Sequence, residues 1–118
     1  MAAPNIVNVS TILGKTATQS LSTSSQTLVN NSLSSNKVFK VNALYVANSD
    51  GALAWTASIA LSRAAGSFQI ASNVSIPANS TLDLISKSIY LEEGDSITTT
   101  SNNSTSVLKV VCSYEEIS

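Results

Sequence analysis

The chain of 118 residues contains no histidine and only one cysteine. Histidine is the commonest general base and a common metal ligand, so its absence excludes Ser-His-Asp and Cys-His catalytic groups. A single cysteine excludes a disulfide within the chain and leaves too few ligands for a typical zinc site. The four glycines lie far apart, at positions 14, 51, 66 and 94, and form no phosphate-binding loop. Only a carboxylate pair or a lysine could support catalysis, and we expect the protein not to be an enzyme.

Charged residues are also scarce, at 11% of the chain, and the net charge is −1. The six basic residues are scattered, so we expect no basic patch and no nucleic-acid partner. A net charge near zero provides little repulsion between copies of the chain. This charge balance fits a protein that works within an assembly.

No apolar run approaches the length of about 20 residues that a membrane-spanning helix needs. The first residues, Met1 to Asn5, lack the basic and apolar segments of a signal peptide. We therefore expect a soluble protein without a membrane partner, made in the cytoplasm of its host. The length suits one domain with one core, and we expect residues 1–118 to form it.

Short polar residues are abundant, since Ser, Thr and Asn make up 45 of the 118 residues. These side chains compete with helical hydrogen bonds and favour turns and extended chain. Between Leu53 and Leu61, apolar residues occupy the odd positions and alternate with small or polar residues, which predicts a half-buried strand. A helix ending near Gly66 is the alternative, but its polar residues would point in several directions around the axis.

Similar patterns predict strands along the whole chain. The other predicted strands are 6–12, 26–30, 37–47, 67–70, 81–85, 89–91, 96–101 and 107–114. The Asn48–Gly51 segment contains Asp-Gly and predicts a hairpin between the strands on either side. The sequence thus predicts an all-β fold, a single antiparallel β-sandwich or jelly-roll-like domain of about seven to nine strands.

The alternation also predicts which residues fill the core. Seven residues are expected there: Trp55, Ile59, Leu61, Leu82, Leu84, Leu108 and Val110. In the strand 37–47, the residues expected on one face are Phe39, Val41, Ala43 and Tyr45. Cys112 follows the same alternation as Leu108 and Val110, so we expect a buried, unreactive thiol rather than a nucleophile.

The one acidic cluster is Glu92, Glu93 and Asp95. Carboxylates at this spacing could bind calcium or form a glycosidase-like pair. A tight turn explains them better, with Gly94 at positive φ and Asp95 bonded to the backbone. Glu115 and Glu116 are read as a soluble chain end or an acidic contact point. We assign no catalytic, cofactor-binding or metal-binding residue, and we expect no cofactor.

Two further features have alternative interpretations. Trp55 could stack on a sugar, but its place in an apolar alternation favours the core. The N-terminal segment, residues 1–18, is either the first strand of the sandwich or an extended arm that pairs with the sheet edge of a neighbouring protein. The sequence leaves both interpretations of this segment open.

Four segments of the chain resemble a known family: AAPNIVNVSTILGKT, KVFKVNALYVANSDG, SIPANSTLDLISKSIYLEEGDSI and LKVVCSYEEI. The family consists of small virion-associated proteins of tailed bacteriophages, particularly phages of marine bacteria. The resemblance covers most of the chain and is sharpest over Ile89–Ile97 and Ser113–Ile117. It brings no catalytic motif with it.

The resemblance implies a structural role in the capsid, neck or tail of a virion, where the partners are other virion proteins. A homo-oligomer is also expected. The alternative is a receptor- or carbohydrate-binding module of a phage tail or fibre, and an enzyme is the third choice. A lectin-like module needs exposed aromatic rings or a calcium site. The chain has only six aromatic residues, and most follow a core-like alternation.

Overall fold

The computed structural model describes residues 10–118, which form nine β-strands and no helix. The strands are β1 (Ile12–Ser20), β2 (Gln26–Asn30), β3 (Val38–Asn48), β4 (Trp55–Arg63), β5 (Gly66–Ile76), β6 (Thr81–Asp83), β7 (Ile89–Leu91), β8 (Ser96–Ser101) and β9 (Leu108–Ile117). The predicted all-β fold and the predicted number of strands are therefore confirmed.

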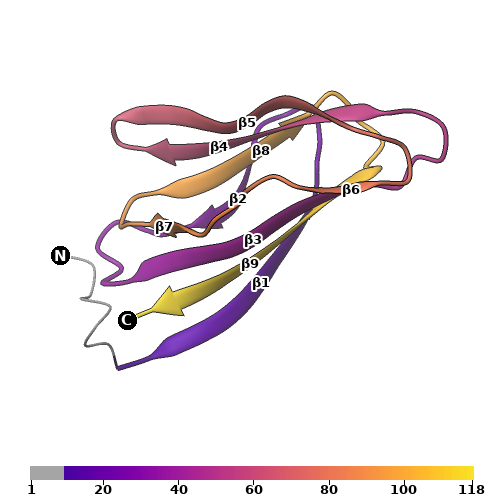
Figure 1. The fold of residues 1–118 in the computed structure, drawn as a ribbon. Coiled ribbons are helices and arrows are strands. Elements are labelled where there is room, and N and C mark those ends of the chain that lie inside the picture. The colour runs from indigo at the N-terminus through magenta and orange to yellow at the C-terminus, as the bar shows by residue number, and fades with distance from the viewer. Residues whose placement is uncertain (1–9) are drawn as a thin grey trace.

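Two antiparallel sheets face each other across the core (Figure 1). Sheet A has the order β1-β9-β3-β6, and β7 also pairs with β3; sheet B has the order β2-β8-β4-β5. Because β6 and β7 pair with opposite ends of β3, they behave as two pieces of one interrupted strand. The first strand then pairs with the last, the second with the last but one, and so on to the β4–β5 hairpin. This is the order of a rolled-up antiparallel hairpin, the jelly roll.

The Asn48–Gly51 segment does not form the predicted hairpin, because β3 and β4 lie in different sheets. The buried Asn48 side chain donates from Nδ2 to the carbonyl oxygens of Leu53 (3.0 Å) and Ile76 (2.9 Å). Asp50 Oδ1 accepts two backbone N–H groups from the residues that follow it. Asp-Gly permits a sharp change of direction, but these side-chain bonds make the segment a crossover between the sheets.

The tight hairpin of the fold joins β4 and β5 instead. Arg63 pairs with Gly66 across the two residues between them, and Gly66 has a φ of 135°. β5 is much longer than the predicted strand 67–70, since it continues to Ile76. Its pairing with β4 shifts register on both sides of Ile59, and these irregularities interrupt the simple alternation that the prediction relied on.

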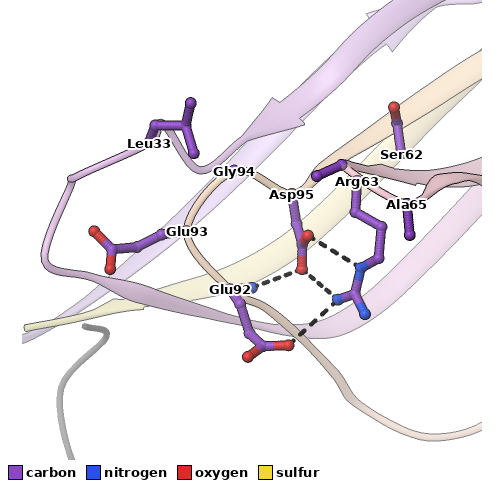
Figure 2. Close-up of a pocket in the computed structure, with 9 residues that line it drawn as sticks. Leu33, Ser62, Arg63, Ala65, Glu92, Glu93, Gly94 and Asp95 are labelled. Carbon is purple, nitrogen blue, oxygen red and sulfur yellow. Dashed lines mark hydrogen bonds and ion pairs between the residues drawn. The ribbon is translucent and has the colours of Figure 1, made fainter. Parts of the chain in front are cut away.

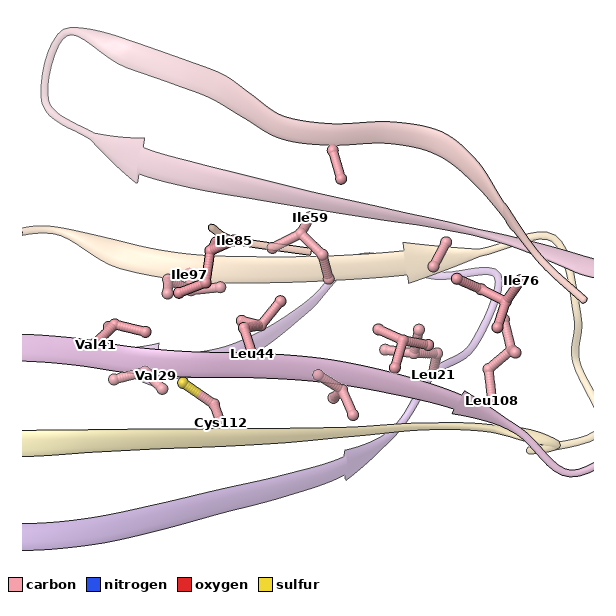
Figure 3. Close-up of a cluster of buried hydrophobic side chains, with 14 of the residues drawn as sticks. Leu21, Val29, Val41, Leu44, Ile59, Ile76, Ile85, Ile97, Leu108 and Cys112 are labelled. Atoms are coloured by element: carbon pink, nitrogen blue, oxygen red, sulfur yellow. The ribbon is translucent and has the colours of Figure 1, made fainter. Parts of the chain in front are cut away.

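One cluster of buried apolar side chains fills the space between the sheets (Figure 3). Leu44 and Val110 of sheet A meet Ile59 and Ile97 of sheet B, and all four are fully buried. Burial of each such side chain contributes about 1.5–3 kcal/mol. Of the seven predicted core residues, Ile59, Leu108 and Val110 are fully buried. The other four are partly buried and pack against the same cluster: Trp55, Leu61, Leu82 and Leu84.

The predicted face of β3 is correct only in its first half. Phe39 and Val41 are buried, but Tyr45 is 43% exposed, and its neighbours Leu44 and Val46 are buried in its place. The cause is a β-bulge, because the register with β9 skips Asn42. One extra residue reverses the face of every residue that follows it.

The strand predicted over Leu53–Leu61 begins later, at Trp55, and ends at Arg63. Leu53 is 56% exposed in the crossover. The inward face was correctly predicted for Ala57 and Ile59, which are both fully buried.

Part of the N-terminal segment lies outside the described residues. The predicted strand 6–12 and the arm 1–18 both begin there, and residues 1–9 are not described. Residues 12–18 belong to β1, which is an end strand of sheet A and pairs with β9 along its whole length.

Candidate functional site

A groove of about 550 Å³ opens at one end of the sandwich, between the β4–β5 turn and the β7–β8 turn. Three segments of the chain line it: Leu33, Ser62, Arg63, Ala64, Ala65, Glu92, Glu93, Gly94 and Asp95. The groove therefore contains the acidic cluster that the sequence singled out, together with an arginine from a distant strand.

The acidic cluster forms the predicted tight turn between β7 and β8. The Asp95 N–H donates to the Glu92 carbonyl oxygen (3.0 Å), and Asp95 Oδ2 accepts the Glu92 N–H (2.9 Å). Gly94 has a φ of 89°, a conformation that side chains with a Cβ rarely adopt. Both details expected from the sequence, a positive φ at Gly94 and a backbone bond to Asp95, are confirmed.

Arg63 lines the groove and forms a bidentate ion pair with Asp95. Its Nε donates to Asp95 Oδ1 (3.1 Å) and its Nη2 to Asp95 Oδ2 (2.5 Å), while Glu92 Oε2 lies 3.4 Å from Nη2. Figure 2 shows the Arg63 guanidinium pointing at both carboxylates. The Asp95 side chain is only 5% exposed. A buried carboxylate with paired, parallel hydrogen bonds is held firmly, so this pair ties the end of β4 to the start of β8.

The opposite wall of the groove is the loop between β2 and β3. Asn31 is fully buried there, and its Nδ2 donates to the carbonyl oxygens of Lys37 (2.9 Å) and Leu91 (3.0 Å). Glu93 Oε2 accepts the N–H of Asn36 (2.9 Å). The three acidic side chains are thus used differently, with Asp95 on an arginine, Glu93 on a backbone N–H and Glu92 at the rim. Their arrangement stabilises two turns, and among residues 10–118 these carboxylates are not grouped as the ligands of a calcium ion would be.

Trp55 is anchored by a hydrogen bond rather than free to stack on a ligand. Its ring packs against the core, and its Nε1 donates to Asp50 Oδ2 (2.9 Å). This bond and those from the backbone N–H groups of Ala52 and Leu53 hold the pKa of Asp50 below its ordinary value. The interpretation of Trp55 as a core residue holds for the ring, while its N–H serves the β3–β4 crossover.

Cys112 is buried in the core, as predicted. Burial raises the pKa of its thiol to about 11, so the thiol remains protonated at neutral pH. Because the thiolate is the reactive form, this cysteine is inert toward nucleophilic chemistry.

Of the two acidic residues near the C-terminus, Glu116 forms ion pairs with other described residues and Glu115 forms none with them. Glu116 lies between two lysines, with Lys15 Nζ at 3.2 Å and Lys37 Nζ at 3.1 Å, and its side chain is 11% exposed. Burial raises the pKa of Glu116, but the hydrogen bonds from Lys37 and Lys15 outweigh burial and leave the pKa below its ordinary value. Glu116 therefore fastens β9 to β1 and to the start of β3.

The outer surface of sheet B carries short, uncharged side chains, and we call it the hydroxyl face. The register of β4 with its neighbours places these residues on it: Ser58, Ser62, Ser67, Gln69, Thr98 and Thr100. Arg63, at the groove, is the only charged residue in the four strands of this sheet. A shallow hollow of about 150 Å³ lies among them.

Sequence reasoning missed the pairing of Arg63 with the acidic turn and the existence of the hydroxyl face. Arg63 and Asp95 are 32 residues apart, and nothing local in the sequence joins them. The lack of charge in the four strands is visible in the sequence, but only the register shows that their serines and threonines share one surface.

Within residues 10–118, no three or more His, Cys, Asp and Glu side chains are grouped so that they could hold a metal ion. The described part of the chain also has no helix with the length and apolar character needed to cross a membrane. The sequence matches no model of a known protein family and no curated protein.

Proposed function

We propose that the chain is a non-enzymatic structural protein of a bacteriophage virion that works by packing against other virion proteins. Within that class, a capsid decoration or cement protein and an accessory protein of the neck or tail are the roles that fit best. The resemblance of four sequence segments to small virion proteins supports the virion as its location. The jelly roll is compatible with this role, although the same fold also serves lectins and enzymes.

The observation that carries the proposal is the hydroxyl face. Burying a charge in an interface is costly, and long charged side chains lose much rotamer entropy when they are ordered. Serine and threonine avoid both penalties, and they can still form hydrogen bonds across the interface. A surface that spans three strands and holds mostly such side chains, without a charged one, suits close packing against another protein.

Mass spectrometry of purified virions tests the proposed location. The chain should be present in particles of the phage that encodes it, in a fixed number of copies relative to the major capsid protein. Its presence in the infected-cell lysate but not in purified particles would refute the proposed location.

Added charge tests whether the hydroxyl face is the contact surface. Thr98→Lys and Gln69→Lys should each reduce incorporation into particles about tenfold or more, because a buried ammonium without a partner disrupts an interface. Ser104→Lys is the matched control, since Ser104 is exposed in the loop between β8 and β9. Normal incorporation of both face variants, with correct folding by circular dichroism, would show that another surface makes the contact.

A receptor- or carbohydrate-binding module of a tail or fibre is the second candidate. The groove beside Arg63 favours it, because the groove is open, has a volume of about 550 Å³ and is lined by a guanidinium and three carboxylates. Its lining contains no aromatic ring on which a sugar could stack, and this places the candidate second. NMR titration with a glycan library should shift resonances of Ala64, Ala65 and Gly94 if the groove binds sugar, and should leave them unchanged otherwise.

A further inference from the structure

The edge strands of the two sheets differ in how well they are protected against pairing with other chains. β6 and β7 have three residues each, β2 has five and a register shift, and β5 has register shifts and a positive φ at Asn73. Short or irregular edge strands are a usual defence against edge-to-edge association. β1 lacks this defence, because it has nine residues and pairs with β9 without a register shift.

The free backbone groups of β1 follow from its register with β9. Thr11 and Ser118 exchange both of their backbone hydrogen bonds, and the Leu21 N–H donates to Leu108 O. In an antiparallel ladder, every second residue bonds to the partner strand, so the odd residues of β1 face β9. The even residues, from Ile12 to Ser20, therefore direct their N–H and C=O groups away from β9, toward a side on which no strand of residues 10–118 pairs with β1.

The first half of β1 is also the most exposed part of this edge. Ile12 is 56% and Leu13 48% exposed. Lys15 is the one charged residue of the strand, and its ammonium already lies 3.2 Å from Glu116 of the same chain. The second half of β1 lies beside sheet B, where Gln19 Nε2 donates to Thr27 O (3.1 Å). The open stretch is residues 12–16.

We propose that this open stretch pairs antiparallel with the same stretch of a second copy of the chain, about a two-fold axis at Gly14. Gly14 then faces Gly14 of the second copy, and Ile12 faces the second copy's Thr16, in hydrogen-bonded pairs. Leu13 faces the second copy's Lys15, whose aliphatic stem covers the leucine. The two sheets A join into one continuous sheet, in an interface that is the same on both copies.

Charge and geometry favour a second copy and this register. A register centred one residue later would place Lys15 opposite Lys15 of the second copy. Like charges that face each other destabilise a strand pair. A register centred on Thr16 would draw Gln19 and Ser20 into the pair at the end where β2 lies alongside. The register at Gly14 avoids both problems, and the low net charge of −1 opposes association little.

This inference deepens the proposed function by naming one partner, and it is tested on the purified full-length chain, separately from particle incorporation. Sedimentation velocity from about 1 µM to 1 mM should show a concentration-dependent dimer. Thr16→Pro removes an outward N–H, and Gly14→Lys places two ammonium groups at the axis. No atom lies within 4 Å of a Cβ built on Gly14, so the monomer should tolerate the lysine. Each variant should weaken dimerisation at least tenfold with an unchanged circular dichroism spectrum.

A cysteine scan tests the register. Paired residues in a hydrogen-bonded pair have Cα atoms about 5.5 Å apart, within the range of a disulfide. Gly14→Cys should therefore give a disulfide-linked dimer under mild oxidation. Thr18→Cys is the matched control, since its two copies would lie roughly 26 Å apart at about 3.3 Å per residue. The native Cys112 is buried and does not compete.

Three results would overturn the inference. The wild-type chain could remain monomeric at all concentrations, which would leave the virion role intact and remove only this partner. The dimer could persist in folded Gly14→Lys and Thr16→Pro variants, which would place the interface elsewhere. Cross-linking through Thr18→Cys and not through Gly14→Cys would refute the proposed register.

Discussion

Three buried asparagines, Asn31, Asn48 and Asn103, hold loops of this chain in place. Each is at most 3% exposed. Their amide groups bond to backbone N–H and C=O groups of neighbouring segments. A neutral amide satisfies buried backbone groups without the large desolvation penalty of a charge. The abundance of asparagine therefore has a structural explanation that goes beyond a preference for turns.

Replacing Asn48 should destabilise the fold through the β3–β4 crossover. Asn48→Ala leaves the carbonyl oxygens of Leu53 and Ile76 without their amide donor, and we expect a loss of about 1–3 kcal/mol in unfolding free energy. Urea denaturation would measure it. Asn30→Ala is the matched control on an exposed asparagine and should change stability by less than about 0.5 kcal/mol. Equal effects of the two variants would show that the amide bonds of Asn48 contribute nothing specific.

Glu116 should make the fold sensitive to acid. Its pKa in the folded chain is below the ordinary value of 4.5, so the unfolded chain binds a proton more readily. The stabilisation is therefore present above about pH 4.5 and is lost as the pH falls through the lower folded pKa. Glu116→Gln should lower the urea midpoint at pH 7 and have less effect at pH 3. Glu115→Gln, which removes no ion pair among the described residues, should shift the midpoint less at pH 7. A deficit for Glu116→Gln that is independent of pH would contradict the role of its charge.

At the scale of the strands, the sequence predicted the elements better than their connections. A period of two is a local property, so strands such as β2, β7 and β8 were predicted with their observed bounds. The bulge at Asn42 and the register shifts beside Ile59 were not predicted, because they depend on partner strands that lie far away in the sequence. The crossover at Asn48 was missed for the same reason. The acidic turn was predicted because its bonds are local, whereas its pairing with Arg63 is not.

The turn between β7 and β8 should depend on glycine at position 94. Its φ of 89° strains any residue that has a Cβ, and a Cβ there would lie 2.9 Å from Leu33 Cδ2. Gly94→Ala should therefore lower the unfolding free energy by about 1–3 kcal/mol. The exposed side chain of Leu33 can move aside. Adding Leu33→Ala to the Gly94→Ala variant should therefore restore little of the lost unfolding free energy.

Gly14→Ala provides the control for Gly94→Ala, because a Cβ on Gly14 would lie in open space and Gly14 has no positive φ. Thermal unfolding at low protein concentration should show a change within about 0.5 kcal/mol for this control. Equal losses at the two glycines would show that backbone conformation at Gly94 is not the cause. Full recovery in the Leu33→Ala double variant would assign the loss to the side-chain contact instead.

At the scale of the whole molecule, the rolled-up order of the strands makes folding depend on distant segments. β1 and β9 pair along their full length, although they lie at opposite ends of the described chain. β9 also separates β1 from β3 and pairs with both. The β4–β5 hairpin is the only adjacent pair of strands in sheet B that is also consecutive in the sequence. β1 therefore cannot join sheet A until β9 is in place.

This topology predicts slow folding. Closing long loops before distant contacts form is entropically unfavourable, so all-β proteins of this kind refold in about 1 ms to several seconds. Trp55 is the only tryptophan, and it packs against the core, so its fluorescence in stopped-flow dilution from urea reports the event. Leu108→Ala should slow refolding if the pairing of β9 with β3 belongs to the transition state, and should mainly speed unfolding if β9 docks later. Refolding of the wild-type chain within microseconds would contradict a rate set by these long-range pairings.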